Sequence, residues 1–320
     1  MIVLLRKEKK MAEITVNELL SKMKDPEHLV ELDEKIYFEK VSQVAERVAA
    51  DKNIRIILLS GPSASGKTTT ANLIADRIRE LGERSAVVSL DNFYRDATDP
   101  KYPRLPDGTR DFESPYALDL DMLLETLGDI IAGEEFTVPR YDFKVGGKVA
   151  FEKYPSFADG CVIIEGIHGL NPILSDPFPK ESVLKVFVSV STNINENGKR
   201  ILSGRKLRFV RRLVRDNLYR AAEAERTLDM WDNVLKGEDK YLYPYKDLAD
   251  IRFDTFHTFE PGIMKPFAEK LLTPEVTSKN KYAATVASAI SKMPVLDEAL
   301  VPNTSLIREF IPGGKYEHLY

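Results

Sequence analysis

The sequence has few of the features that mark secreted, disulfide-bonded or membrane proteins. Only one of its 320 residues is a cysteine, so no internal disulfide can form. This residue, Cys161, lies within an apolar run, which predicts a core side chain rather than a nucleophile. No apolar run reaches the 18 residues that predict a membrane span, and residues 1–10 place a short apolar piece before charge, the reverse of a secretory signal. We therefore expect a cytoplasmic protein without membrane contact.

A strong net charge is also lacking. The formal net charge is −4, with 30% charged and 43% hydrophobic residues, which is typical of an ordinary globular protein. This balance gives no general attraction to nucleic acid or to a membrane surface. We expect a small-molecule substrate rather than nucleic acid as the partner, and the sequence leaves open whether the chain forms a homo-oligomer.

What the chain does contain is a glycine-rich loop with a strand signal before it and a helix signal after it. Residues 61–68 fit the pattern G-x-x-x-x-G-K-[ST]; an apolar, β-branched stretch at 54–59 precedes them, and apolar residues at helical spacing follow at 71–81. Glycines let backbone N–H groups turn toward a phosphate, and the helix N-terminus adds partial positive charge. We expect Lys67 to reach the β- and γ-phosphates of ATP and the Thr68 hydroxyl to ligate Mg²⁺. The expected ATP-binding residues are Gly61, Pro62, Ser63, Ala64, Ser65, Gly66, Lys67, Thr68 and Thr69.

Apolar strand signals alternate with helical signals along the rest of the chain. Beyond the first, they lie at 85–90, 161–165, 184–190 and 249–254. This alternation predicts an α/β protein of the P-loop NTPase fold, with a doubly wound, mostly parallel sheet and right-handed crossovers. A predicted β-hairpin turns around Gly146-Gly147 and supplies a substrate-binding element, and a helical segment rich in arginine supplies a lid.

The two flanks of this core predict extensions. Thr15 and Glu18 form a predicted capping box for a short helix that Asp25-Pro26 ends, and residues 36–50 have helical spacing. Residues 273–281 are expected to be a polar linker before a last helix. The predicted division is a helical N-terminal extension at 1–52, a P-loop kinase domain at 53–272 with a lid at about 195–236, and a C-terminal helical extension and tail at 273–320.

Polar side chains follow the predicted strands, at the sheet edge where ligands of parallel sheets gather. Asp91 can accept the proton of an attacking hydroxyl, or it can cap a turn. Glu165 ends an apolar strand and can hold Mg²⁺, or it can be a solvated strand end. Asp111 and Glu113, in the long loop at 96–115, can bind sugar hydroxyls, and a purely structural role is equally open for them.

Arginines crowd the helical segment that follows the predicted fourth strand. They are Arg205, Arg208, Arg211, Arg212, Arg215 and Arg220. A solvated basic face, open to RNA, is one interpretation. The other is a lid whose arginines, Arg212 and Arg215 foremost, neutralise the charge of the phosphoryl group in transfer. An open lid of this kind is expected to bury little surface.

Histidine and aromatic residues have structural alternatives as well. His168 follows Glu165-Gly-Ile167, where it can contact substrate or serve as a structural histidine. Trp231 and the tyrosine-rich run at 241–245 are interpreted as packing residues rather than as platforms for stacking bases.

Six pieces of the sequence together resemble a known family. They are Gly61-Pro-Ser-Ala-Ser-Gly-Lys-Thr68, Ser89-Leu-Asp-Asn-Phe-Tyr94, Asp111-Phe-Glu-Ser-Pro115, Pro139-Arg-Tyr-Asp-Phe143, Glu165-Gly-Ile167 and Arg211-Arg-Leu-Val-Arg-Asp216. In this order they resemble the uridine kinase and phosphoribulokinase family of P-loop kinases, over residues 54–272.

Further pieces resemble one branch of that family, the bacterial uridine kinase-like nucleoside kinases. They are Glu165-Gly-Ile-His-Gly-Leu-Asn-Pro172, Thr227-Leu-Asp-Met-Trp231, Gly237-Glu-Asp-Lys-Tyr241 and Ser305-Leu-Ile-Arg-Glu-Phe310. That branch often carries a threonyl-tRNA-synthetase-like N-terminal domain, which we expect to be replaced here by residues 1–52.

The resemblance implies ATP-dependent phosphorylation of the 5′-hydroxyl of a nucleoside, of uridine or cytidine type, with Mg²⁺. Asp91 would be the base, Lys67, Arg212 and Arg215 would act with it in catalysis, and Thr68 and Glu165 would hold the metal. The substrate-binding residues so implied are Tyr94, Asp111, Glu113, Tyr141, Phe143, His168 and Arg220.

Two departures from the family pattern concern the acceptor. Uridine kinases usually place a base-reading histidine shortly after Tyr-Asp-Phe, whereas Lys144-Val-Gly-Gly147 follows here. They also usually carry Arg-Gly-Arg in the lid, and this chain has Arg220-Ala-Ala222. Two alternatives therefore stay open: a kinase for another hydroxylated small molecule such as a sugar phosphate, or a nucleotide-dependent switch or RNA-associated protein without kinase activity.

Overall fold

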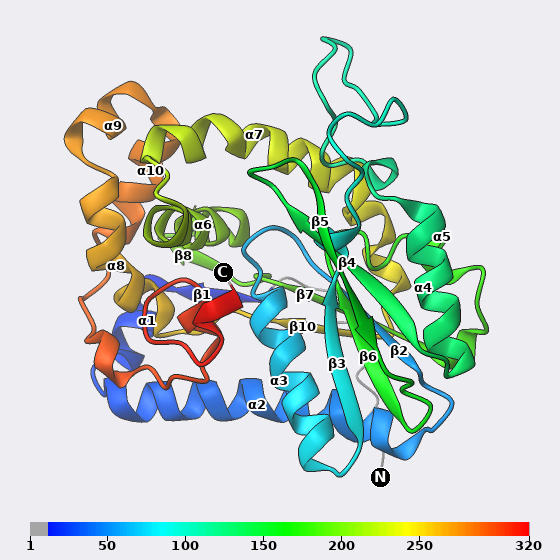
Figure 1. Cartoon of the computed structure of the whole chain (residues 1–320). Helices are drawn as coiled ribbons and strands as arrows, with labels where there is room; N and C mark the ends of the chain where they lie inside the picture. The colour runs from blue at the N-terminus through cyan, green and yellow to red at the C-terminus, as the bar shows by residue number, and fades with distance from the viewer. Residues whose placement is uncertain (1–11, 320) are drawn as a thin grey trace.

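A five-stranded parallel sheet forms the centre of the computed structural model, which describes residues 12–319 (Figure 1). Its strands are β2 (Ile56–Ser60), β3 (Arg84–Ser89), β6 (Gly160–Glu165), β7 (Val183–Ser189) and β10 (Ile251–Asp254). They lie in the order β10-β7-β2-β6-β3, so every connection between neighbours is a crossover. The predicted doubly wound α/β fold is confirmed.

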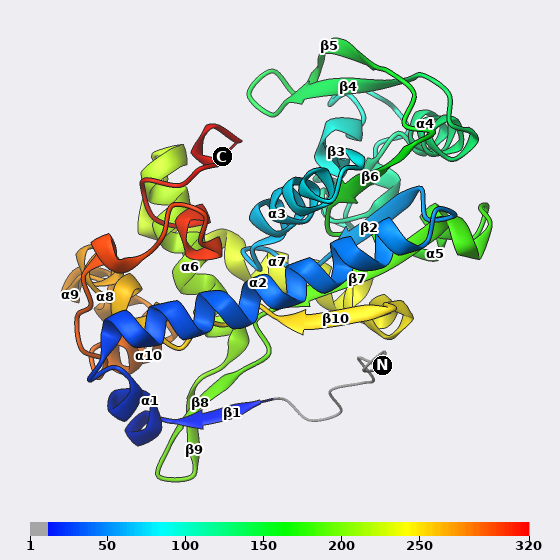
Figure 2. The same cartoon turned by 90° about the horizontal axis from the view of Figure 1, so that it is seen from below.

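Alternate side chains of β2 enter two separate cores, because successive residues of a strand point to opposite faces of the sheet. Ile57 and Leu59 pack with α2 (Pro26–Ala50) and α3 (Lys67–Glu80), which lie alongside each other (Figure 2). Ile56 and Leu58 pack on the other face, with α4 (Leu120–Ala132) and the hairpin. The central strand is buried on both faces, which explains why its sequence has no polar alternation.

The remaining elements surround this sheet. Two smaller sheets are the antiparallel hairpin β4 (Phe136–Asp142) and β5 (Gly147–Tyr154), and the group of β1 (Glu13–Thr15), β8 (Asn193–Glu196) and β9 (Lys199–Leu202). The remaining α-helices are α1 (Val16–Lys22), α5 (Pro172–Ser175), α6 (Gly204–Arg220), α7 (Ala224–Tyr241), α8 (Glu260–Leu271), α9 (Pro274–Lys279) and α10 (Lys281–Ile290). Within residues 12–319, no helix combines the length and apolarity that crossing a bilayer requires.

Several boundaries differ from the sequence predictions. The Thr15–Glu18 capping box is present, but Pro26 also starts the next helix, with Asp25 as its N-cap, so α2 begins ten residues before the predicted 36. Proline is well suited to a first helical position, where its missing N–H has no partner to lose. The predicted polar linker at 273–281 is wrong, because α9 starts there in the same way, at Thr273-Pro274. Strands β1, β8 and β9 were not predicted.

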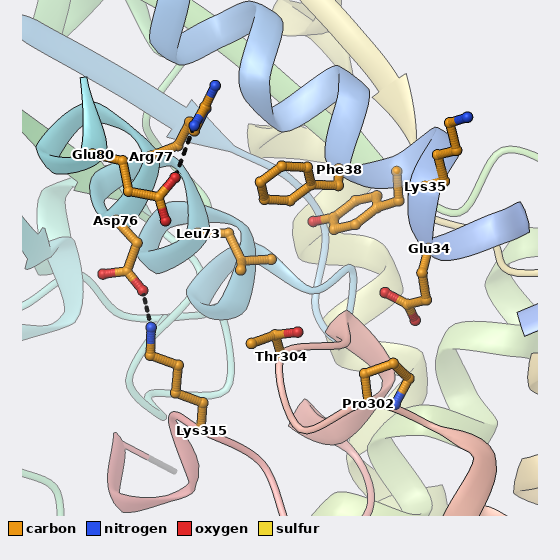
Figure 3. A pocket seen from close by; sticks show the side chains of 11 residues that line it. Glu34, Lys35, Phe38, Leu73, Asp76, Arg77, Glu80, Pro302, Thr304 and Lys315 are labelled. Atoms are coloured by element: carbon orange, nitrogen blue, oxygen red, sulfur yellow. Dashed lines mark hydrogen bonds and ion pairs between the residues drawn. The ribbon is translucent and has the colours of Figure 1, made fainter. Parts of the chain in front are cut away.

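The C-terminal segment packs on the same core as the sheet. Leu306, Ile307 and Phe310 are fully buried there, and Lys315 donates a hydrogen bond to Asp76 of α3 at 2.5 Å. Residues of this segment, α2 and α3 together line a cavity of about 360 Å³, and Figure 3 shows the Lys315–Asp76 contact beside it. The residues after 272 are thus built into the core around the glycine-rich loop. Cys161 is buried as predicted.

Candidate active site

The glycine-rich loop connects β2 to α3. Neither of the two glycines that define its sequence pattern, Gly61 and Gly66, leaves room for a larger residue. A Cβ atom on Gly61 would lie 2.2 Å from the carbonyl oxygen of Val188, which is an impossible contact. Gly66 has a φ of +87°, and a Cβ atom there would lie 2.3 Å from the Leu306 side chain. The hydroxyl oxygen of Ser65 is buried without a hydrogen-bond partner among residues 12–319. This combination of a tight loop and an unused hydroxyl fits a phosphate-binding cradle.

A buried ion pair holds the tip of this loop. The carboxylate of Glu238, in α7, accepts hydrogen bonds from both terminal nitrogens of Arg208, in α6, at 2.7 and 2.8 Å. The same carboxylate accepts from the Ser63 N–H at 2.8 Å, and Arg208 donates to the Ser63 carbonyl at 2.8 Å. Both backbone groups of Ser63 are therefore fixed from outside the loop.

Carboxylates meet the loop lysine at the carboxyl ends of the strands. Glu165 pairs in register with Leu59 of β2 and Ser89 of β3, so it stands between the ends of these two strands. The pKa of Glu165 is raised to about 7, because burial and the Asp91 charge raise it more than Lys67 lowers it. The charged form of a buried carboxylate with a raised pKa gains from a nearby cation.

Asp91 lies directly after β3, in a short 3-10 turn at Leu90–Phe93. Asp91 keeps solvent-exposed surface, but the protein atoms packed around its carboxyl group raise its pKa. The positive charges of Lys67, Arg220 and Arg215 lower this pKa. Its own backbone N–H is bonded to the Ser89 hydroxyl, and its carboxylate is not used as a helix cap among the described residues. This placement suits a proton acceptor beside the loop.

The arginines of α6 divide into two sets. Arg208 and Arg211 are fully buried: Arg208 pairs with Glu238, and Arg211 makes a two-pronged pair with Glu260 at 2.6 and 2.7 Å. Arg211 also donates to the backbone carbonyl of Thr255 at 2.8 Å. These two side chains hold the fold together and are closed to ligands.

The second set faces the loop and the strand ends. Arg212 donates to the Ser63 hydroxyl at 2.8 Å, and Arg212, Arg215 and Arg220 each lie within 3.4 Å of the Asp216 carboxylate. Asp216 is shared by all three cations and Glu309 lies 3.9 Å from Arg215, so two carboxylates stand against three positive charges near Asp91 and the loop. Arg215 and Arg220 both lower the pKa of Asp91, which places them in its surroundings.

The expectation that this helix buries little surface is wrong. Leu207, Phe209, Val210, Leu213 and Val214 are all buried in the main core. Helix α6 packs against α7 and α8 as an ordinary amphipathic helix, with its apolar face inward. A lid built from 195–236 stays a prediction, and in this state its helices are docked.

The predicted acceptor residues also converge. Tyr94, Tyr141 and Phe143 form a cluster in which the ring centroids lie 5.0 to 5.8 Å apart, with tilted or edge-on planes. The Tyr94 hydroxyl donates to the Phe112 carbonyl at 2.9 Å, which ties the cluster to the long loop. Tyr94 is buried in the second core while Phe143 is 60% exposed, so the cluster extends from the core to an open edge.

The carboxylates of the long loop lie next to α7. The pKa of Glu113 is raised to about 7, because burial and the Glu238 charge raise it more than Arg212 lowers it. Asp111 accepts a hydrogen bond from the Tyr241 hydroxyl at 2.8 Å. His168 is buried with its ring 6.3 Å from that of Tyr241, and burial lowers its pKa to about 4, so it is neutral at pH 7. The residues predicted to bind ATP and those predicted to bind the phosphate acceptor thus lie around one site.

Four residues of this site were not assigned from sequence. Glu238 and Tyr241 contact the two loops as described, and Gly237 lies against Glu113. Glu309 is buried, and its carboxylate accepts from the backbone N–H of Thr69 at 3.2 Å, at the N-terminus of α3. The only signal was their presence in the pieces 237–241 and 305–310 that carried the resemblance, because nothing in those pieces indicates which distant residue each contacts. Trp231 is a packing residue, as predicted.

These features agree with the relationships of the chain. The model of the Phosphoribulokinase / Uridine kinase family matches residues 56–260. The chain belongs to this family. The predicted resemblance is therefore confirmed.

Similar proteins match this chain over about the same part. The chain is 30% identical over 205 residues to a uridine kinase of Staphylococcus haemolyticus, a match that covers 62% of this chain and 86% of that protein. It is 27% identical over 198 residues to uridine kinase-like protein 5 of Arabidopsis thaliana, covering 61% of this chain but only 38% of that protein. Among solved structures, a possible uridine kinase from Bacillus stearothermophilus is similar at 19% identity and a TM-score of 0.46, covering 68% of this chain and 98% of that one.

Proposed function

We propose that this chain transfers the γ-phosphate of ATP to the 5′-hydroxyl of a nucleoside, of uridine or cytidine type. The observation that carries the proposal is the meeting of Asp91, Lys67 and the site-facing arginines at the mouth of the glycine-rich loop. A protein that only senses nucleotide does not need a proton acceptor at this place, whereas a phosphotransferase does.

In the proposed reaction the acceptor hydroxyl oxygen forms a bond to the γ-phosphorus, and the bond from that phosphorus to the β–γ bridging oxygen breaks. The hydroxyl proton passes to Asp91, and ADP leaves with the electrons of the broken bond. Lys67 stabilises the charge on the β- and γ-phosphates from the loop side, and Arg212 and Arg215 stabilise it from α6.

The residues at the strand ends fit a magnesium ion carried with ATP. The described residues contain no group of three His, Cys, Asp or Glu side chains that could hold a metal by themselves. Mg²⁺ in kinases is usually bound through one or two protein oxygens, with phosphates and water completing its shell. Thr68 and Glu165 would supply these oxygens, and the ion would neutralise phosphate charge. The raised pKa of Glu165 supports this, because a cation would favour its charged form.

The acceptor is assigned from the residues opposite the loop and from the relatives. Glu113 and Asp111 can accept hydrogen bonds from ribose hydroxyls, while Tyr94, Tyr141 and Phe143 offer ring faces and edges to a base. The relatives from Staphylococcus haemolyticus and Dictyostelium discoideum, each 30% identical over the matched residues, are named uridine kinase and uridine-cytidine kinase. Their names supply the substrate class of the proposal.

The test is a screen of ATP consumption against nucleosides, sugar phosphates and small hydroxy acids. We expect turnover with uridine or cytidine that exceeds turnover with the other two classes. Turnover with a sugar phosphate and none with any nucleoside would replace the proposed acceptor while keeping the phosphotransfer chemistry. The absence of ATP consumption with every acceptor would contradict the proposal as a whole.

A further inference from the structure

The last turn of α7 touches both halves of the site. Three of its residues, Gly237, Glu238 and Tyr241, each make a contact that spans more than one hundred residues of sequence. In a helix, residues i and i+4 share a face, and the residue at i+1 is turned by about 100° from the first. Gly237 and Tyr241 therefore face the acceptor loop together, while Glu238 faces the phosphate loop.

The contact at Gly237 explains why a glycine stands inside a helix. A Cβ atom at this position would lie 2.5 Å from both Cβ and Cγ of Glu113, whereas Cβ atoms essentially never come within 3.0 Å of a non-bonded atom. Glycine within a helix destabilises it by about 1 kcal/mol relative to alanine. The φ of Gly237 is not in the left-handed region, so backbone conformation does not require a glycine here. The close approach of Glu113 thus explains the glycine at 237, and the backbone of α7 packs directly against the Glu113 side chain.

Glu238 and Tyr241 make directed contacts to the two loops. Glu238 has no exposed surface, and its carboxylate holds the Ser63 N–H and the Arg208 guanidinium. One helical turn later, the Tyr241 hydroxyl donates to Asp111 at 2.8 Å. A single rigid turn therefore carries one anchor for the phosphate loop and two for the acceptor loop.

We propose that residues 237–241 are a positioning element that sets the distance between the phosphate loop and the acceptor loop. The proposal rests on the proposed function, since it assigns these two loops to donor and acceptor. In-line transfer needs the reacting atoms about 3 to 3.5 Å apart, and a displacement of 1 Å can lower the rate about 10²-fold. Because one turn of the docked α7 contacts both loops, it fixes this distance.

The first test compares Gly237→Ala with Lys236→Ala, an exposed neighbour in the same helix. We expect Gly237→Ala to raise the KM for the nucleoside and to lower kcat, together by about 10²-fold in kcat/KM, while the dissociation constant for ATP stays unchanged. Lys236→Ala should keep all three values. If Gly237→Ala leaves the nucleoside KM unchanged, or weakens ATP binding by the same factor, the proposal is overturned.

Tyr241→Phe is the milder variant, because it removes only the hydroxyl and keeps the ring packed. We expect the nucleoside KM to rise about tenfold, in line with the loss of one hydrogen bond to a charged group, with no change in the KM for ATP. An equal effect on both KM values would mean that the ring serves general stability and would count against a positioning role.

Glu238→Gln tests the contact of α7 with the phosphate loop, and the measurement needs no acceptor substrate. The amide keeps an acceptor for the Ser63 N–H but loses charge opposite Arg208, so the dissociation constant for ATP, measured by equilibrium titration, should rise at least several-fold. Unchanged ATP affinity would overturn the donor half of the proposal. Because this readout needs no nucleoside, it stays decisive even if the chain proves to phosphorylate another acceptor.

Discussion

The phosphate loop and the acceptor hairpin lie on the same site but are held in very different ways. Ser63, at the tip of the loop, has both backbone groups bonded to a buried ion pair. In the β4–β5 hairpin, Phe143 and Val145 are 60% and 70% exposed. Stabilising charge in a transition state requires groups that are fixed beforehand, whereas a wall that only covers the acceptor can stay open until the ligand arrives. The structure thus predicts that donor-side changes alter rates strongly and that acceptor-side changes alter selectivity mildly.

The largest effect is expected for Lys67→Ala on the donor side. The only hydrogen bond of this side chain among the described residues is to the Pro62 carbonyl at 3.1 Å, so folding should be unaffected. Loss of its charge from the phosphates should lower kcat by about 10³-fold or more. Steady-state kinetics alongside a thermal unfolding curve checks this, and near-normal kcat would refute the phosphate-loop assignment.

Asp91→Asn should have the next largest effect. We expect kcat to fall by about 10²- to 10⁴-fold, the usual contribution of a general base. The affinity for ATP should be kept, because the proposed partner of Asp91 is the acceptor hydroxyl rather than the nucleotide. Rates from single-turnover mixing, together with an ATP titration, separate the two quantities. Wild-type turnover in this variant would make Asp91 a structural residue.

Two neighbouring arginines sharpen the comparison within one helix. Arg211→Ala leaves Glu260 buried without its partner and should lower the free energy of unfolding by about 3–5 kcal/mol. Arg212→Ala should lower kcat by about 10²-fold with a much smaller change in stability, since Arg212 faces the site. Denaturant unfolding and kinetics of both variants decide this, and a similar stability loss in both would show that α6 has no catalytic face.

On the acceptor side, the protonation of Glu113 predicts a milder effect of pH. Its pKa is raised to about 7, so the charged form, which accepts hydrogen bonds from ribose hydroxyls, becomes less populated as pH falls below about 7. The nucleoside KM should therefore rise as pH falls below 7, by up to about tenfold per pH unit. The contribution of Glu113 to the free energy of unfolding has the opposite pH dependence. It increases as pH falls, because the folded protein raises the pKa of Glu113 and so favours its neutral form.

Glu113→Gln is the control for this pH effect. Its nucleoside KM should be raised at all pH values and should not change between pH 8 and pH 6. Asp91, Asp111, Glu238 and Arg212 also surround Glu113, so a pH dependence that persists in the variant would assign the titration to one of these groups instead.

The smallest effect is expected for the identity of the base. No histidine follows Tyr141-Asp-Phe143, and ring contacts from these aromatic residues accept any base because every base has a π-face. We expect kcat/KM values for uridine, cytidine and adenosine that differ by less than about tenfold, and larger losses for their 2′-deoxy forms. Strict preference for one base would show that Lys144 or His168 reads it.

The parts that could be predicted from sequence are those with local signals. Strand, glycine loop and helix are adjacent in the chain, and Asp91 and Glu165 follow strands whose parallel order brings their ends together. The buried pairs Arg208–Glu238 and Arg211–Glu260 join residues 30 and 49 positions apart, and neither periodicity nor composition indicates such partners. For the same reason the docked state of α6 was not foreseen.

The C-terminal segment shows the same limit more sharply. Leu306 and Glu309 reach Gly66 and Thr69 across about 240 residues. The sequence around them has proline and glycine turns without hydrophobic periodicity, so it predicted a tail. Their burial depends on the shape of the core around α3, which only the folded chain provides.

The most direct test of the account follows the γ-phosphate itself. Protein is mixed in excess with ATP labelled at the γ-position and with uridine, and the products are separated after a single turnover, for the wild type and for Asp91→Asn. The account predicts that the wild type places the label on the 5′-oxygen of the nucleoside and that Asp91→Asn binds ATP but forms this product at least about 10²-fold more slowly. Label released only as inorganic phosphate, or equal transfer by the two proteins, would contradict it.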